Sequence, residues 1–151
     1  MIAYCTTHCS ATPPSVNYTV EQLTADHKAR GFRTIGYHWY ITRDGMRHKG
    51  RNELELGAHV SGHNNYNIGI CLEGGVNEQG KTEDNFTEAQ WDEWILLVKE
   101  IQGRHRLGLD KFKGHRDWSP DLNGDGTIQA SERIKECPCF DVRDKLKELL
   151  G

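Results

Sequence analysis

The sequence predicts a single α/β domain, with a mixed central β-sheet flanked by helices. Two observations support this class. Segments with the composition of strands alternate with segments of helical periodicity, and no linker, repeat or low-complexity tract divides the 151 residues. Interleaved strands and helices favour a sheet that is covered on both faces. A chain of this length can bury most of one hydrophobic core, although the pattern does not give the strand order.

Three segments have the composition of strands: residues 2–9, 37–43 and 66–73. The first is followed by a Thr-Pro-Pro-Ser tetrapeptide and the second ends at the turn signal Asp44-Gly45. The third reads Tyr-Asn-Ile-Gly-Ile-Cys-Leu-Glu, which is typical of a buried central strand. A short fourth strand is expected over residues 110–114.

Capping boxes predict where two helices begin. Thr19-Val20-Glu21-Gln22 opens a helix that is expected to end at Gly31. Thr87-Glu88-Ala89-Gln90 opens the longest helix, to about Arg104, whose core-facing positions at helical spacing are Trp91, Trp94, Ile95, Val98 and Ile101. Residues 141–150 predict a closing helix with four inward side chains, Val142, Leu146, Leu149 and Leu150.

Charge and hydropathy exclude several classes of protein. The formal net charge is −3 and the basic residues are scattered, which argues against a nucleic-acid binder. The longest run of aliphatic residues is Ile95-Leu96-Leu97-Val98, so no membrane insertion is expected. No basic segment followed by an apolar stretch opens the chain, so we expect synthesis in the cytoplasm without a signal peptide. The protein is expected to be a monomer.

Side chains that can bind a metal occur at three sharply punctuated places: Thr7-His8-Cys9-Ser10-Ala11-Thr12, Gly114-His115-Arg116-Asp117 and Lys135-Glu136-Cys137-Pro138-Cys139-Phe140-Asp141. Two imidazoles and one thiolate suit Zn²⁺, with the fourth tetrahedral position left for a water molecule that the metal would activate as a nucleophile. Residue types alone leave an alternative open. Histidines and cysteines this far apart in sequence are equally well explained as surface imidazoles and inert buried thiols.

The chain resembles the zinc-dependent N-acetylmuramoyl-L-alanine amidases, which include lysozyme-type endolysins of phages and the peptidoglycan recognition proteins. The motifs that carry the resemblance occur in order over nearly the whole chain: His8-Cys9-Ser10-Ala11-Thr12, Gly36-Tyr37-His38, Arg43-Asp44-Gly45, Gly57-Ala58-His59, Asn64, Ile68-Gly69-Ile70, Gly114-His115-Arg116-Asp117 and Cys137-Pro138. One departure is Asn67, where the family commonly has serine.

The resemblance implies a role for individual residues. His8, His115 and Cys137 match the zinc ligands. Tyr37 matches the tyrosine beside the metal-bound water, and Lys135 matches the lysine that stabilises the oxyanion, a donor typically worth about 3–4 kcal/mol of barrier. Further matches in the substrate groove are His59 and Asn64. A core tyrosine and a solvated lysine are the structural alternatives for Tyr37 and Lys135.

The remaining histidines and cysteines are expected to be structural. His38 follows Tyr37 and should point to the opposite face of its strand. Four histidines lie in no motif and are expected on the surface: His27, His48, His63 and His105. Three cysteines are expected to pack within strands: Cys5, Cys9 and Cys71. Cys139 could supply a fourth thiolate, but the family usually has no ligand at that position.

A second motif lies between His115 and Cys137. The twelve residues from Asp121 fit the pattern of an EF-hand calcium loop, with Asp121, Asn123, Asp125, Thr127 and Glu132 at the ligand positions. Asp, Asn and Gly also favour ordinary turns. Trp118-Ser119-Pro120 does not predict a regular entering helix, so the segment 121–132 is interpreted as a calcium-loop insertion in a single amidase domain spanning residues 1–151.

The sequence therefore predicts a zinc hydrolase that cleaves the amide bond between N-acetylmuramic acid and L-alanine in peptidoglycan. A phage or prophage endolysin, released to the cell wall through a holin-type pore, fits the small size. A non-catalytic peptidoglycan-binding module of the same fold is the first alternative, although Cys137 is present. A cysteine peptidase built on Cys9 or Cys71 is the second alternative.

Overall fold

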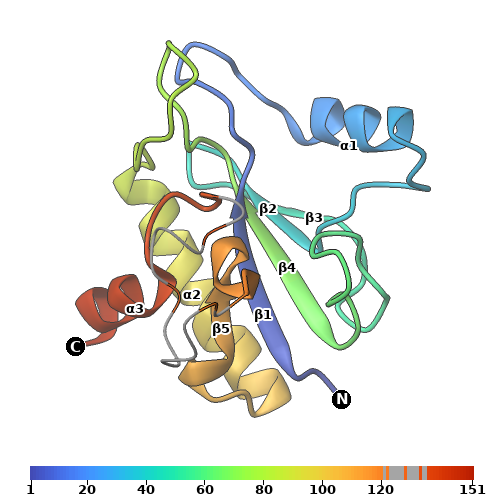
Figure 1. Cartoon of the computed structure of the whole chain (residues 1–151), viewed down its shortest axis with the longest axis vertical. Coiled ribbons are helices and arrows are strands. Elements are labelled where there is room, and N and C mark those ends of the chain that lie inside the picture. Colours follow the sequence, from blue (N-terminus) through green and yellow to red (C-terminus); the bar gives the residue numbers. More distant parts are fainter. Residues whose placement is uncertain (121, 123–127, 129–132, 134–135) are drawn as a thin grey trace.

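The computed structural model describes residues 1–120, 122, 128, 133 and 136–151. A five-stranded sheet forms the centre of the molecule, with strand order β3-β2-β4-β1-β5 (Figure 1). The strands are β1 (Tyr4–Cys9), β2 (Trp39–Ile41), β3 (Arg47–Lys49), β4 (Asn67–Leu72) and β5 (Phe112–Gly114). Only the β2–β3 pair among these strands is antiparallel, so the sheet is mixed, as predicted.

The helices of the described residues lie close to their predicted ranges. They are α1 (Val20–Ala29), α2 (Glu88–His105) and α3 (Val142–Leu150), with short 3₁₀ turns η1 (Leu109–Lys111) and η2 (His115–Trp118). The capping box of α2 is complete, because Thr87 and Gln90 bond each other's backbone N–H groups. The box of α1 is half formed. Thr19 accepts from the Gln22 N–H, but the Gln22 side chain donates to Asp26.

Alternating side chains of the strands separate two apolar clusters, one on each face of the sheet. The larger cluster joins the sheet to α2 and α3 through residues that include Ile70, Leu72 and Trp94. The smaller one contains Leu23 of α1, Ile35, Tyr40 and Cys71. All six residues of β4 are buried, which confirms its prediction as a central strand. Helices therefore cover both faces, as the alternation of elements predicted.

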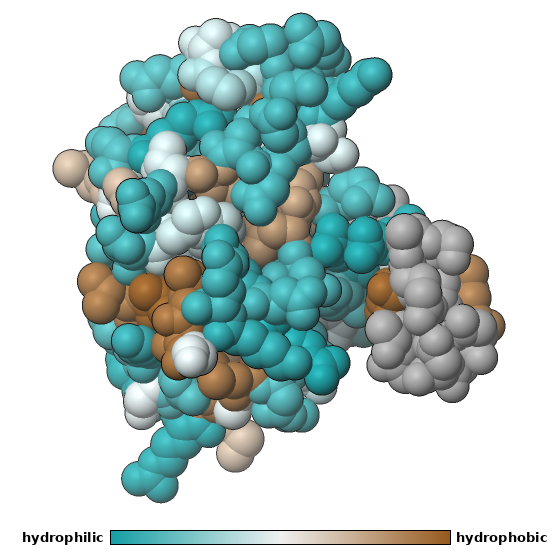
Figure 2. Space-filling view, turned by 90° about the vertical axis from the view of Figure 1, so that its left-hand side faces the viewer, coloured by the Kyte–Doolittle hydropathy of each residue, from teal (hydrophilic) through white to brown (hydrophobic). Residues whose placement is uncertain are grey.

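Four predictions about individual side chains need correction. His38 was expected to point to the face opposite Tyr37, but β2 begins only at Trp39, and both rings pack against His59, with centroids 5.7 Å (His38) and 6.5 Å (Tyr37) away. Leu149 and Leu150 are 37% and 38% exposed, because Val142 and Leu146 already fill the core-facing side of the short helix α3. Figure 2 shows the side of the molecule on which α3 lies in Figure 1, and apolar surface is visible there. His27 is buried rather than on the surface, since its Nδ1 atom accepts a hydrogen bond from the Gly36 N–H at 2.8 Å.

Within the described residues, no helix combines the length and apolarity needed to cross a membrane.

Candidate metal and active site

Strand β1 directs His8 to the face of the sheet opposite α2. Cys5 packs in the α2-side core, and Thr7 accepts a hydrogen bond from the indole N–H of Trp94 at 3.1 Å. Because side chains alternate along a strand, Thr6 and His8 project to the other face. His8 is only 1% exposed there. Its position is therefore fixed by the central sheet itself.

His115 reaches the same place from the neighbouring strand. Strand β5 pairs in parallel with β1 and ends at Gly114, so the carboxyl ends of both strands meet at one edge. The chain then turns through η2, and the Gly114 N–H donates to Asp117 Oδ2 at 2.7 Å. This bond explains the Gly-His-Arg-Asp motif, because Asp117 fixes the turn that carries His115.

Hydrogen bonds hold Cys137 beside both histidines. The Cys9 N–H donates to Cys137 Sγ at 3.1 Å, and the Arg116 N–H donates to the Cys137 carbonyl oxygen at 2.8 Å. A Cβ atom at Gly114 would lie 2.8 Å from Pro138 Cδ, so glycine allows the Cys137-Pro138 segment to approach β5. Arg116 also faces Glu136, with 3.8 Å between its Nη1 atom and a carboxylate oxygen.

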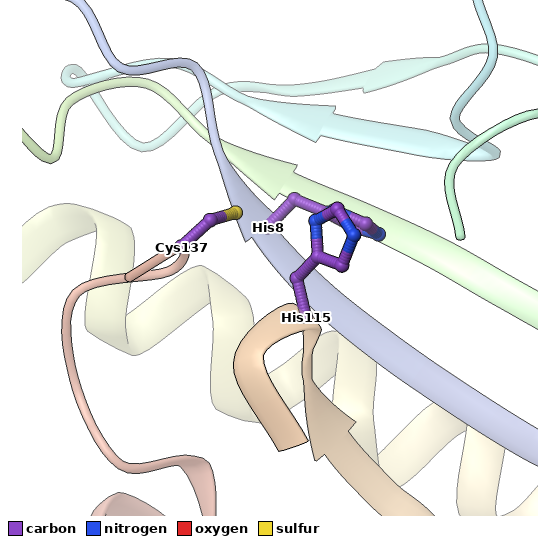
Figure 3. Close-up of side chains that lie close together, drawn as sticks. All are labelled: His8, His115 and Cys137. Atoms are coloured by element: carbon purple, nitrogen blue, oxygen red, sulfur yellow. The ribbon is translucent and has the colours of Figure 1, made fainter. Parts of the chain in front are cut away.

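The three predicted ligands converge although they come from distant parts of the sequence. One ligand atom from each of His8, His115 and Cys137 lies within 4.8 Å of the other two (Figure 3). The Nδ1 atoms of His8 and His115 are 3.1 Å apart. Two nitrogens bound to one tetrahedral Zn²⁺ are roughly 3.3 Å apart, given bonds of about 2.0–2.1 Å. Two imidazoles and a thiolate therefore fit zinc in both donor type and spacing.

Tyr37 and His59 lie next to His8 on this face. The ring centroids of Tyr37 and His8 are 5.0 Å apart, and burial raises the pKa of the Tyr37 hydroxyl well above its ordinary value. A protonated hydroxyl at this position can donate a hydrogen bond.

His59 is 8% exposed and its Nδ1 atom lies 2.9 Å from His8 Nε2. Burial lowers the pKa of His59 to about 3. Asn64 supports this segment by accepting from the backbone N–H groups of His59 and Val60.

Comparison with known proteins agrees with the geometry of the site. Residues 1–138 match the Amidase_2 family, described as N-acetylmuramoyl-L-alanine amidase. The chain is 36% identical over 136 residues to the endolysin of Enterobacteria phage T3, covering 90% of this chain and 80% of the endolysin.

The chain belongs to the N-acetylmuramoyl-L-alanine amidase family.

Two solved structures extend the comparison to the fold. The N-acetylmuramoyl-L-alanine amidase LysC from Clostridium intestinale URNW superposes with a TM-score of 0.75 at 26% identity, covering 99% of this chain and 85% of LysC. Drosophila PGRP-LB shares the fold with a TM-score of 0.70 at 22% identity, covering 97% of this chain and 79% of PGRP-LB. The protein is thus a peptidoglycan amidase, which hydrolyses the bond between N-acetylmuramic acid and L-alanine.

The other thiols of the amidase do not favour a cysteine peptidase. Cys71 is fully buried, and burial raises its pKa well above the ordinary value. The pKa of Cys9 is raised to about 12, first by its hydrogen bond with Cys137 and further by burial. A nucleophilic cysteine needs an accessible thiolate. Cys139 bonds elsewhere, since its Sγ donates to the Gly75 carbonyl oxygen at 3.1 Å and lies 3.9 Å from Cys9 Sγ.

Asn67 and Arg116 have structural roles around the site that the sequence analysis did not assign. Asn67 Oδ1 accepts from the Thr6 hydroxyl at 2.9 Å, and the Asn67 carbonyl faces His59 Nε2 at 2.8 Å. The one signal for Asn67 was its departure from the serine that is common in the family. Arg116 was recognised only as a member of the Gly114-His115-Arg116-Asp117 motif, which did not indicate its contacts with Glu136 and Cys137. Each acts through contacts between segments far apart in sequence, which local patterns do not encode.

Several predicted functional residues lie outside the described residues. They are Lys135 and the five calcium-loop positions Asp121, Asn123, Asp125, Thr127 and Glu132.

Proposed function

We propose that this protein is a zinc-dependent endolysin amidase in which His8, His115 and Cys137 hold the metal. The observation that carries the proposal is the convergence of their three ligand atoms within 4.8 Å. His8 comes from β1, and His115, whose Nδ1 atom faces His8 Nδ1, comes from the turn η2 that follows the parallel neighbour β5. A site built on the central sheet is held more rigidly than one built on loops.

Bound zinc would lower the pKa of a water molecule and polarise the amide carbonyl of the substrate. Tyr37 is proposed to orient the attacking water or to relay its proton, since its ring lies beside that of His8 and burial keeps its hydroxyl protonated. Lys135 is proposed to stabilise the negative charge that develops on the carbonyl oxygen. It lies two residues before Cys137, so the ligand and the ammonium group belong to one short segment.

Peptidoglycan is the substrate class, and His59 and Asn64 are proposed to lie along the groove that receives it.

We also propose a single amidase domain over residues 1–151 that acts as a monomer. The segment 121–132 is proposed to bind Ca²⁺ through Asp121, Asn123, Asp125, Thr127 and Glu132. Ordering that segment would help to position Lys135 and Cys137.

The biological setting is proposed to be lysis of a bacterial host at the end of a phage or prophage cycle. Endolysins of several phages, including T3 and T7, are relatives at about a third sequence identity. The protein would be made in the cytoplasm and reach the cell wall through a holin-type pore.

Mass spectrometry of digested peptidoglycan tests the proposed function. Hydrolysis at the proposed bond releases stem peptides with a free N-terminal L-alanine and leaves glycan strands whose lactyl carboxyl groups are free. Chelation should stop the reaction, zinc should restore it, and Cys137→Ser should abolish it. New reducing sugar ends in place of free alanine would contradict the amidase. Binding to cell walls with no product from either protein would favour the non-catalytic module.

A further inference from the structure

The two ring nitrogens of His8 face two different histidines. His8 Nδ1 lies 3.1 Å from His115 Nδ1. His8 Nε2 lies 2.9 Å from His59 Nδ1. The chain of contacts continues, because His59 Nε2 lies 2.8 Å from the carbonyl oxygen of Asn67.

The carbonyl group at the end of this chain determines where the protons are. A carbonyl oxygen only accepts, so His59 Nε2 must carry hydrogen and donate it to Asn67. A neutral His59 then has a lone pair on Nδ1, which accepts from His8 Nε2–H. This leaves the lone pair of His8 on Nδ1, the nitrogen that faces His115. One backbone carbonyl thereby selects the tautomer of His8 that can bind a metal through Nδ1.

Glycines shape a pocket that fixes the His59 ring. A Cβ atom at Gly69 would lie 2.8 Å from His59 Cγ, and one at Gly57 would lie 2.7 Å from His59 Cδ2. The backbone of the His59 segment is held by Asn64 Oδ1, which accepts from the His59 N–H at 2.9 Å. The Gly-Ala-His and Ile-Gly-Ile motifs thus surround a single imidazole.

We propose that His59 is a positioning residue for the metal site, which orients His8 and holds it in the tautomer that binds zinc through Nδ1. The inference rests on the zinc site proposed above, and it gives His59 a role beneath that site in addition to the predicted one in the substrate groove. A second imidazole in contact with a ligand histidine takes the place of the carboxylate, carbonyl or water that usually fixes such a ligand.

His38 provides a matched control. It is also fully buried, and it also joins two backbone groups: its Nδ1 accepts from the Gly69 N–H at 2.9 Å, and its Nε2 lies 2.8 Å from the Glu55 carbonyl oxygen. Its ring packs edge-on against His59, with centroids 5.7 Å apart. Replacing His38 therefore removes a buried, bonded imidazole from the same face of the sheet while the contact between His8 and His59 is kept.

The first experiment measures zinc dissociation constants by competition with a chromophoric chelator. We expect His59→Ala to weaken zinc binding by about 10–100-fold, the usual effect of removing the partner of a ligand histidine. His59→Gln, whose amide oxygen can accept from His8, should recover part of the loss. His38→Gln should stay within about twofold of the wild type. Equal losses in the His59 and His38 variants, or none in His59→Ala, would overturn the proposal.

The second experiment separates this proposal from the proposed zinc site. Long-range ¹H–¹⁵N spectra of the metal-free protein report which ring nitrogen of each histidine is protonated. His8 should be protonated at Nε2 in the wild type and should become a mixture of tautomers in His59→Ala and, to a smaller extent, in His59→Gln. A wild-type His8 protonated at Nδ1 overturns the role of His59. Wild-type protein that shows the expected tautomer but binds zinc no better than Cys137→Ser overturns the zinc site alone.

Discussion

The Nδ1 atoms of His8 and His115 lie 3.1 Å apart, although 107 residues separate the two histidines in sequence. The contact exists because β1 and β5 are parallel neighbours in the sheet and both end at the same edge. A metal site built on this pair, as proposed above, would depend on the correct pairing of β1 with β5.

Zinc should stabilise the folded protein as well as activate it. A ligand that binds only the folded state contributes about 2.7 kcal/mol at a concentration of 100 times its dissociation constant. For a protein of this size that corresponds to a rise in melting temperature of several degrees. Thermal unfolding with and without zinc measures the effect, and Cys137→Ser is the control that should not respond. An equal rise in both proteins would show that zinc binds elsewhere.

Removal of the Tyr37 hydroxyl should affect catalysis rather than folding. Tyr37→Phe is expected to lower kcat by about 10²-fold or more, the range for a group that orients or relays a proton, with zinc affinity unchanged. Tyr40→Phe is the matched control, because the hydroxyl of this buried tyrosine donates to the Tyr18 carbonyl oxygen at 2.7 Å. It should cost about 1 kcal/mol of stability and leave kcat unchanged. Equal rates for Tyr37→Phe and wild type would contradict the role.

Much of the fold could be predicted because the signals were local. The capping box at Thr87 and the apolar spacing of α2 depend on residues within a few turns of one helix. The β4 strand was recognisable from an apolar run. Strand β3, Arg47–Lys49, has three polar residues and pairs only with β2 within the described sheet, so nothing in its composition indicated a strand.

The site was predicted less completely, for a related reason. Ordered motifs pointed to His8, His115 and Cys137, and the structure brings them together. The contact between His59 and His8 depends on the space left by Gly57 and Gly69. These glycines lie on different segments, so the spacing of residues in the sequence does not predict the contact. His27 is likewise buried through contacts with residues outside its helix, a hydrogen bond from the Gly36 N–H and ring contacts with Phe32 and Tyr37.

Gly69 should tolerate no side chain. A Cβ atom there would lie 2.8–2.9 Å from three atoms of the His59 ring, so Gly69→Ala must displace the imidazole or the strand. We expect a loss of about 1–3 kcal/mol in the free energy of unfolding, the usual cost of overpacking, together with weaker zinc binding. Gly103→Ala in α2 is the control, since its Cβ would meet nothing within 4 Å. It should stabilise the helix by up to about 1 kcal/mol. The prediction fails if the two variants are equally stable.

Glu53 should make the protein sensitive to acid. Burial acts to raise the pKa of this carboxyl, but hydrogen bonds from Arg104, His105 and Trp39 outweigh it and lower the pKa to about 2 from 4.5. Because the folded-state pKa lies below the unfolded one, the contribution to stability is fully present above pH 4.5. It is lost as the pH falls toward 2.

Urea unfolding of the metal-free protein between pH 6 and 2.5 measures this contribution, which amounts to at most about 3 kcal/mol. Glu53→Gln should be less stable than the wild type at pH 6 and should lose less stability as the pH falls. Glu148→Gln removes a carboxylate that is 65% exposed beside Lys145, and it should keep the acid dependence of the wild type. Parallel curves for wild type and Glu53→Gln would refute the assignment.

Calcium should bind to the segment 121–132 and stabilise the protein. Oxygen ligands at the proposed positions suit Ca²⁺, and loops of this kind span dissociation constants from about 10⁻⁸ to 10⁻³ M. Calorimetric titration of the zinc-loaded protein should detect one site, and Asp125→Ala should weaken it by at least tenfold. Asp110→Ala, which removes an exposed carboxylate outside the motif, should bind Ca²⁺ as the wild type does.

Because the segment connects His115 to Cys137, Ca²⁺ should also raise the rate of peptidoglycan hydrolysis. Titrations that show no heat and rates that do not change with Ca²⁺ would mean that the acidic residues form an ordinary turn.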